Sequence, residues 1–155
     1  MKLSRDVREF ISLLNSHGVE YLVVGGYAVA YHGHPRLTGG IDFWVRPSED
    51  NARRLLAVLD ASGFAGLGIG LGDLVTPGKV VQLGLPPNRI DLVTAIAGVD
   101  FDAAWSNLIA AQLDGLAVAV VGYADLLKNK RAVGRARDLA DVEEIESVAA
   151  ARPTN

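Results

Sequence analysis

A glycine pair between an apolar run and a helical segment is the feature that most constrains the fold. Residues 21–24 form a β-branched apolar run that is typical of a strand buried on both faces. Gly25 and Gly26 follow at once, and residues 27–32 have the composition of a short helix. Glycine lets the backbone approach a ligand closely, and the free amides at a helix N-terminus attract phosphate. This order predicts an α/β fold with a candidate anion site at the turn, although such turns also arise for packing reasons alone.

Length and composition indicate one globular domain. The chain has 155 residues, of which 50% are hydrophobic, and we expect a single domain over residues 1–150 with a frayed tail at 151–155. The net charge of -3 argues against binding nucleic acid by overall charge, but it leaves room for a local basic patch. The chain has no cysteine, which excludes disulfides and thiolate metal sites. The N-terminal residues do not resemble a signal peptide and no apolar run approaches the ~20 residues of a membrane helix, so we expect a cytoplasmic protein without a membrane partner.

Apolar periodicity predicts the remaining elements. Helical spacing predicts helices over residues 7–14, 49–61, 101–112, 124–132 and 137–149, and apolar runs predict strands over residues 41–45, 80–83, 89–93 and 116–121. Residues 63–72 are rich in glycine and lack periodicity, which predicts a flexible loop or a weak strand. Together these elements predict an α/β (α+β) architecture, a small mixed sheet with flanking helices.

Two aspartates lie within predicted strands. Asp42 lies in the run 41–45 and Asp91 lies in the run 89–93. Aspartate is depleted in strands and is costly to bury without a partner. Two such carboxylates on neighbouring strands suggest a shared cation, and carboxylate oxygens suit Mg²⁺. For either aspartate alone, the alternative is an ion pair with Arg36 or Arg89.

The order of these features resembles the nucleotidyltransferase superfamily, and in particular the small bacterial nucleotidyltransferases related to the AbiEii toxin proteins. The resemblance covers nearly the whole chain. It is carried by the strand ending in Gly25-Gly26, the loop Arg36-Leu37-Thr38, the stretch Thr38-Gly39-Gly40-Ile41-Asp42, the later strand Asp91, and a C-terminal pattern of Leu127, Lys128, Lys130, Arg135, Asp138, Leu139 and Asp141. It implies the nucleotidyltransferase (polymerase beta-like) fold.

The resemblance also implies an activity and site residues. The expected reaction is the Mg²⁺-dependent transfer of a nucleoside monophosphate from an NTP to a hydroxyl of RNA or protein, in a toxin–antitoxin setting with an antitoxin protein as partner. Asp42 and Asp91 would be catalytic metal ligands. Gly25, Gly26, Arg36, Thr38 and Lys128 would bind the nucleotide. We expect Arg135, Asp138 and Asp141 to form an ion-pair network that fixes the last helix rather than to act in catalysis.

The sequence departs from the family pattern at Gly40. The related motif commonly carries its first aspartate there, and residues two apart on a strand share a face, so position 40 should point the same way as Asp42. Glycine supplies neither a ligand nor a charge, which predicts an impaired two-metal site that a Gly40→Asp substitution would restore. Three explanations stay open: a natural impaired member, a deliberate inactivation, or a ligand recruited from elsewhere. The alternative function is an inactive nucleotide- or partner-binding module of the same fold.

Overall fold

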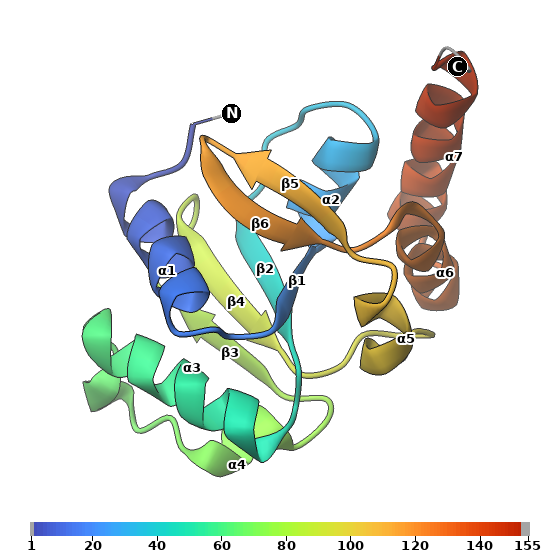
Figure 1. The fold of residues 1–155 in the computed structure, drawn as a ribbon. Helices are drawn as coiled ribbons and strands as arrows, with labels where there is room; N and C mark the ends of the chain where they lie inside the picture. Colours follow the sequence, from blue (N-terminus) through green and yellow to red (C-terminus); the bar gives the residue numbers. More distant parts are fainter. Residues whose placement is uncertain (1, 153–155) are drawn as a thin grey trace.

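A computed structural model describes residues 2–152, and its centre is a six-stranded mixed sheet in the order β3-β4-β2-β1-β6-β5 (Figure 1). The strands are β1 (Tyr21–Val24), β2 (Gly40–Val45), β3 (Val80–Leu83), β4 (Arg89–Val93), β5 (Ile109–Leu113) and β6 (Leu116–Val120). Strand β2 pairs antiparallel with β1 and parallel with β4, while β1 and β6 are parallel. The predicted mixed sheet is therefore confirmed.

Helices cover the sheet in two groups (Figure 1). One group is α1 (Arg5–Ser16), α3 (Glu49–Ala61) and α4 (Leu71–Val75), and the other is α2 (Gly25–His32), α6 (Tyr123–Val133) and α7 (Ala136–Ala151). Ser4 caps α1 by accepting a hydrogen bond from the Val7 amide, and Ser48 caps α3 in the same way at Asn51. Phe10 of α1 packs against Phe43 of β2, which also meets Tyr21 edge-on, so the first group closes over an aromatic centre of the core.

The predicted helix over residues 101–112 is wrong in its second half. The helix α5 (Phe101–Trp105) ends after one turn, and residues 109–113 form β5, an edge strand paired with β6. The hairpin turn is Asp114-Gly115, where φ is 49° and 80° respectively. Both residues therefore occupy the left-handed region, which a two-residue type I′ turn requires and which Asp-Gly favours. The alanines of this segment favour a helix locally, but strand pairing with β6 prevails. The Asp-Gly dipeptide is the sequence signal that predicts this hairpin.

The glycine-rich segment also differs from expectation. The glycine-rich residues 63–72 contain no strand in the described structure but a 3₁₀ turn η1 (Ala65–Leu67), and the helix α4 follows and buries Leu74. Of the tail predicted to fray, residues 151–155, Ala151 ends α7 and residues 153–155 lie outside the described structure, so the fraying stays a prediction. Over the described residues, no helix has both the length and the apolar character needed to cross a membrane.

Candidate functional site

The Gly25-Gly26 turn brings the start of α2 against β2. Gly25 has φ of +65°, and a Cβ on it would overlap the Oδ2 atom of Asp42. A Cβ on Gly26 would lie 2.6 Å from the methyl carbon of Thr38, whose hydroxyl donates to the carbonyl of Gly40 at 2.9 Å. Both glycines are therefore needed for the strand-to-helix turn to approach this closely. The free amides at the N-terminus of α2 lie beside Asp42 as a result.

Asp42 and Asp91 lie side by side, as the sequence predicts. They are register partners on the parallel strands β2 and β4, so both point to the same side of the sheet. Asp91 is 5% exposed and Asp42 is half-buried. Burial, a hydrogen bond with Asp91 and the charge of Asp91 together raise the pKa of Asp42 from 3.8 to about 7. The predicted geometry is confirmed, whereas the roles of the two carboxylates remain predictions.

Arg89 is the partner of Asp91. Its Nε lies 3.0 Å and 3.2 Å from the two carboxylate oxygens of Asp91, and its Nη2 lies 3.0 Å from Oδ2. Arg89 and Asp91 are two residues apart on β4, which puts their side chains on one face. The ion pair left open as an alternative is therefore present, and both oxygens of Asp91 are engaged by a guanidinium.

A side chain at position 40 has no room in the described structure. Gly40 is the register partner of Arg89, and a Cβ built on Gly40 would overlap the Arg89 carbonyl oxygen and lie 2.9 Å from the Arg89 Cβ. The register of β2 on β4 is regular, with Gly40, Ile41 and Asp42 opposite Arg89, Ile90 and Asp91. At Gly40 the two backbones approach too closely for a side chain between them. A carboxylate at position 40 cannot reach the cleft without moving a strand.

The side chains present do not fit the two-cation site that the family resemblance implies. Within residues 2–152, no three or more aspartate, glutamate or histidine side chains gather as a metal-ligand group. Of the acid pair, Asp91 is already bonded through both oxygens to Arg89, and Asp42 shares a hydrogen bond with Asp91. Two cations bridged by three carboxylates is the arrangement that clamps attacking and leaving oxygens. The donor set here is too small for it.

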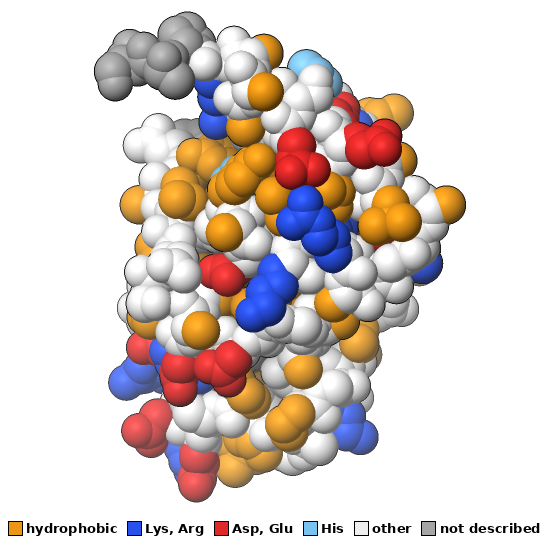
Figure 2. Space-filling view, turned by 90° about the vertical axis from the view of Figure 1, so that its right-hand side faces the viewer, with side chains coloured by type: hydrophobic (Ala, Val, Ile, Leu, Met, Phe, Trp, Pro, Cys, Tyr) orange, Lys and Arg blue, Asp and Glu red, His pale blue; other side chains and the backbone are white. Residues whose placement is uncertain are grey.

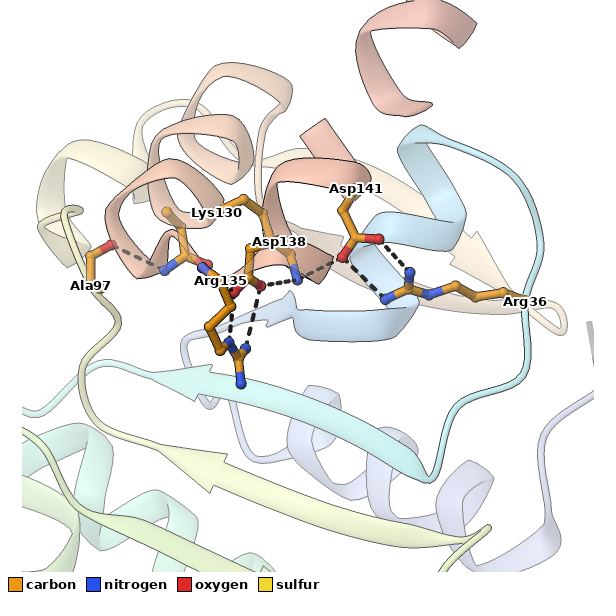
Figure 3. A network of polar contacts seen from close by, with 7 residues as sticks. Arg36, Ala97, Lys130, Arg135, Asp138 and Asp141 are labelled. Carbon is orange, nitrogen blue, oxygen red and sulfur yellow. Dashed lines mark hydrogen bonds and ion pairs between the residues drawn. The ribbon is translucent and has the colours of Figure 1, made fainter. Parts of the chain in front are cut away.

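An ion-pair network joins α6, α7 and the loop before β2 (Figure 3). Lys130 lies 3.3 Å from Asp138 and 3.1 Å from Asp141. Arg135 lies 2.7 Å from Asp138, and Arg36 lies 2.6 Å from Asp141. Arg135, and after it Lys130, lower the pKa of Asp138 from 3.8 to about 2 against the opposing effect of burial. The predicted network around Arg135, Asp138 and Asp141 is confirmed, and it extends to Arg36.

Lys130, and not Lys128, is the lysine of the cleft. Lys128 is exposed on α6 and does not line the cleft, whereas Lys130 is 9% exposed and does. Two residues that are two positions apart on a helix are about 200° apart around its axis, so only one of them can face α7 and the sheet. The pattern of the C-terminal segment predicts a cleft lysine but selects the wrong one. The burial of Leu126, Leu127 and Lys130 defines the inner face.

These elements enclose a cleft of about 480 Å³ with a predominance of positive charge. Five of its lining side chains are cationic and two are carboxylates: Arg36, Arg89, Lys130, Arg135 and Arg137 against Asp42 and Asp141, with Gly25, Gly26, Leu37, Thr38, Gly39 and Gly40 completing the wall. On the neighbouring outer face, basic and acidic side chains are intermixed and form no broad basic patch (Figure 2). The excess of basic side chains in the cleft thus does not continue over this face (Figure 2), and the net charge of the chain is -3. The cleft suits a small, multiply charged anion.

Asp42 makes the stability of the fold depend on pH. Because its pKa is raised from 3.8 to about 7, the folded state holds the proton over a pH range where the unfolded chain has lost it. Stability therefore falls as the pH rises through that range and stays low above it. We expect Asp42→Asn to raise the free energy of unfolding by about 2–4 kcal/mol at pH 8 and to change it little at pH 4. Urea unfolding at both pH values measures this, and the exposed Asp60→Asn serves as control. Equal effects of Asp42→Asn at the two pH values would contradict it.

Comparison with known proteins supports the fold. No protein-family model and no curated protein matches the sequence. A candidate nucleotidyltransferase from Thermotoga maritima superposes with a TM-score of 0.55 at 15% identity, covering 94% of this chain and 89% of that one. An antigenic nucleotidyltransferase-like protein from Paracoccidioides brasiliensis superposes with a TM-score of 0.54 at 17% identity, covering 98% of this chain and 80% of that one. Together with the mixed sheet and its flanking helices, these similarities show that the chain has the nucleotidyltransferase fold.

Proposed function

We propose that the cleft binds the phosphates of a nucleoside triphosphate and that nucleotidyl transfer by this chain is impaired. The observation that carries the proposal is the convergence of five cationic side chains on the Gly25-Gly26 turn at the N-terminus of α2. Backbone amides at a helix N-terminus and guanidinium groups are the donors that bind phosphate oxygens best. The cleft has the volume for a polyphosphate with its ribose.

Impairment follows from the acid pair. Activation of an attacking hydroxyl and compensation of the leaving group need carboxylates that are free to act on the reacting atoms. Asp91 is held by Arg89, and position 40 cannot present a carboxylate toward the cleft. These contacts favour the second candidate of the same fold, a nucleotide- or partner-binding module without turnover. An AbiEii-type relationship, an RNA or protein acceptor and an antitoxin partner rest on the sequence resemblance alone and stay predictions.

Binding of nucleotides tests the proposal directly. We expect saturable binding of one or more of ATP, GTP, CTP and UTP in isothermal titration calorimetry, and about a tenfold loss of affinity in Arg137→Gln, because a charge-assisted bond to phosphate is removed. Lys128→Gln is the matched control, since that side chain is exposed and lies outside the cleft. Absence of binding by the unmodified chain, or an equal loss in Lys128→Gln, would reject the cleft as a nucleotide site.

Turnover is measured separately. Labelled NTPs are incubated with a pool of total RNA or protein, and we expect the unmodified chain to transfer no more label than Asp42→Asn does. Strong transfer by the unmodified chain would reject the impaired-site proposal while leaving nucleotide binding in place.

A further inference from the structure

Arg89 provides a fixed positive charge beside the two carboxylates. Its guanidinium bonds both oxygens of Asp91, and Asp91 is the register partner of Asp42, so this charge lies beside the acid pair where a bound metal ion would otherwise offset the two carboxylates. We infer that the Arg89 guanidinium takes the place of a divalent cation at the Asp42–Asp91 pair, so that the cleft binds polyphosphate without a metal. The second half of this inference rests on the proposed nucleotide binding.

Gly40 allows β2 to approach the backbone of β4 closely at Arg89. The two are register partners, and a side chain at position 40 would collide with the backbone and the Cβ of Arg89. The colliding atoms are the carbonyl group and the Cβ of residue 89, so glycine at position 40 permits the close approach of β2 to β4 that sets Arg89 beside the acid pair. This gives Gly40 a structural role in addition to the missing ligand. We therefore expect that a carboxylate added at position 40 alone does not rebuild a metal site.

The arginine leaves donors for a ligand. A guanidinium has five N–H donors in a planar fork. The bonds to Asp91 use Nε and Nη2, and Arg89 lines the cleft, so its Nη1 donors are left for a phosphate oxygen. Arg36, Lys130 and Arg135 line the same cleft, and they can donate to phosphate in exchange for their present partners Asp141 and Asp138. A polyphosphate that arrives free of metal thus meets guanidinium and ammonium donors in the place of a cation.

Binding of Mn²⁺ to the ligand-free protein tests the replacement independently of nucleotide. Electron paramagnetic resonance counts bound Mn²⁺ in the unmodified chain, in Arg89→Gln and in the double variant Arg89→Gln/Asp42→Asn. We expect Arg89→Gln to bind Mn²⁺ at least about tenfold more tightly than the unmodified chain, and the double variant to lose that gain. Tight binding by the unmodified chain, or no gain in Arg89→Gln, would overturn the inference.

Removing Arg89 leaves the buried Asp91 without its cationic partner, so the stability of the variant has to be measured as well. The unfolding temperature of Arg89→Gln should rise with Mn²⁺ concentration, whereas the unfolding temperature of the unmodified chain should not. Arg89→Lys keeps a positive charge but lacks the fork that engages both oxygens, so it should fold without metal and gain Mn²⁺ binding in part. If Arg89→Lys binds Mn²⁺ no more tightly than the unmodified chain, that result counts against the inference even if Arg89→Gln does not fold.

Binding of ATP and of inorganic tripolyphosphate, each with Mg²⁺ and with EDTA, completes the test. We expect affinities of the unmodified chain that differ by less than about twofold between the two conditions, and Mg²⁺-dependent binding in Arg89→Gln. Affinity that collapses in EDTA for the unmodified chain would overturn metal-independent binding. Absence of polyphosphate binding in every condition would reject both the proposed function and metal-free recognition, while the Mn²⁺ result still decides whether Arg89 holds the place of a cation.

Discussion

Gly40→Asp is expected to lower the free energy of unfolding by about 2–3 kcal/mol and to leave nucleotidyl transfer at background. The reason is steric. A Cβ at position 40 would overlap the carbonyl oxygen of Arg89 and lie 2.8 Å from its carbonyl carbon, so either β2 or β4 has to shift. Backbone in a paired strand is far less able to move than the end of a long side chain. The added carboxylate would moreover meet β4 and not the space above Asp42.

Gly39→Asp is the matched control for this substitution. It adds the same side chain and charge one residue earlier, where the nearest heavy atom to a new Cβ is the Pro86 Cβ at 3.9 Å. Urea unfolding should therefore separate the two variants clearly, and the transfer assay with labelled NTP should show no gain in either. A Gly40→Asp variant as stable as Gly39→Asp, with new transfer activity, would show that position 40 does face the reaction centre.

Lys130→Met is expected to destabilise the fold by about 3–5 kcal/mol. Lys130 is 9% exposed and lies between Asp138 and Asp141, which are 1% and 8% exposed. Removing the ammonium leaves these carboxylates with Arg135 and Arg36 as their remaining cationic partners, one at each end of the network. The cost is the penalty of buried charge that has lost compensation, which exceeds the value of an exposed ion pair several-fold.

Lys128→Met provides the comparison on the same helix. Its side chain is exposed, so the same chemical change should alter stability by less than about 0.5 kcal/mol. Chemical denaturation of both variants measures the difference. Equal stabilities would mean that the network contributes nothing to holding α6 against α7.

The order of elements and the embedded aspartates allow most of the fold and part of the site to be predicted from sequence. Period-two alternation places Asp42 and Asp91 on faces that a parallel pairing brings together, and that pairing is found in register. Helical periodicity is a weaker guide at α6, where Lys128 and Lys130 are equally plausible until the packing of α7 fixes the inner face. The helical prediction for residues 101–112 failed because pairing between β5 and β6 outweighs local alanine content.

The geometry at Gly40 could not be predicted from sequence. Whether a missing side chain leaves a gap or avoids a collision depends on the register of β2 against β4 and on the local direction of the Cα–Cβ bond. The motif pattern supplies neither quantity. Similarly, the bond between Arg89 and Asp91 is visible as a same-face pair in sequence, but whether both carboxylate oxygens are engaged is a matter of rotamer.

The ion-pair network has a kinetic and energetic consequence for any anion that enters the cleft. Arg36 already pairs with Asp141, and Arg135 already pairs with Asp138. An anion that binds these arginines therefore replaces a carboxylate partner and does not meet an unpaired cation. The gain in free energy is the difference between two similar interactions, which keeps affinity moderate and release fast. Exchange at Arg36 would also loosen its tie to α7, because this one side chain joins the loop before β2 to that helix. Occupancy of the cleft would then change how firmly α7, which lines the cleft through Arg137 and Asp141, is held against this loop.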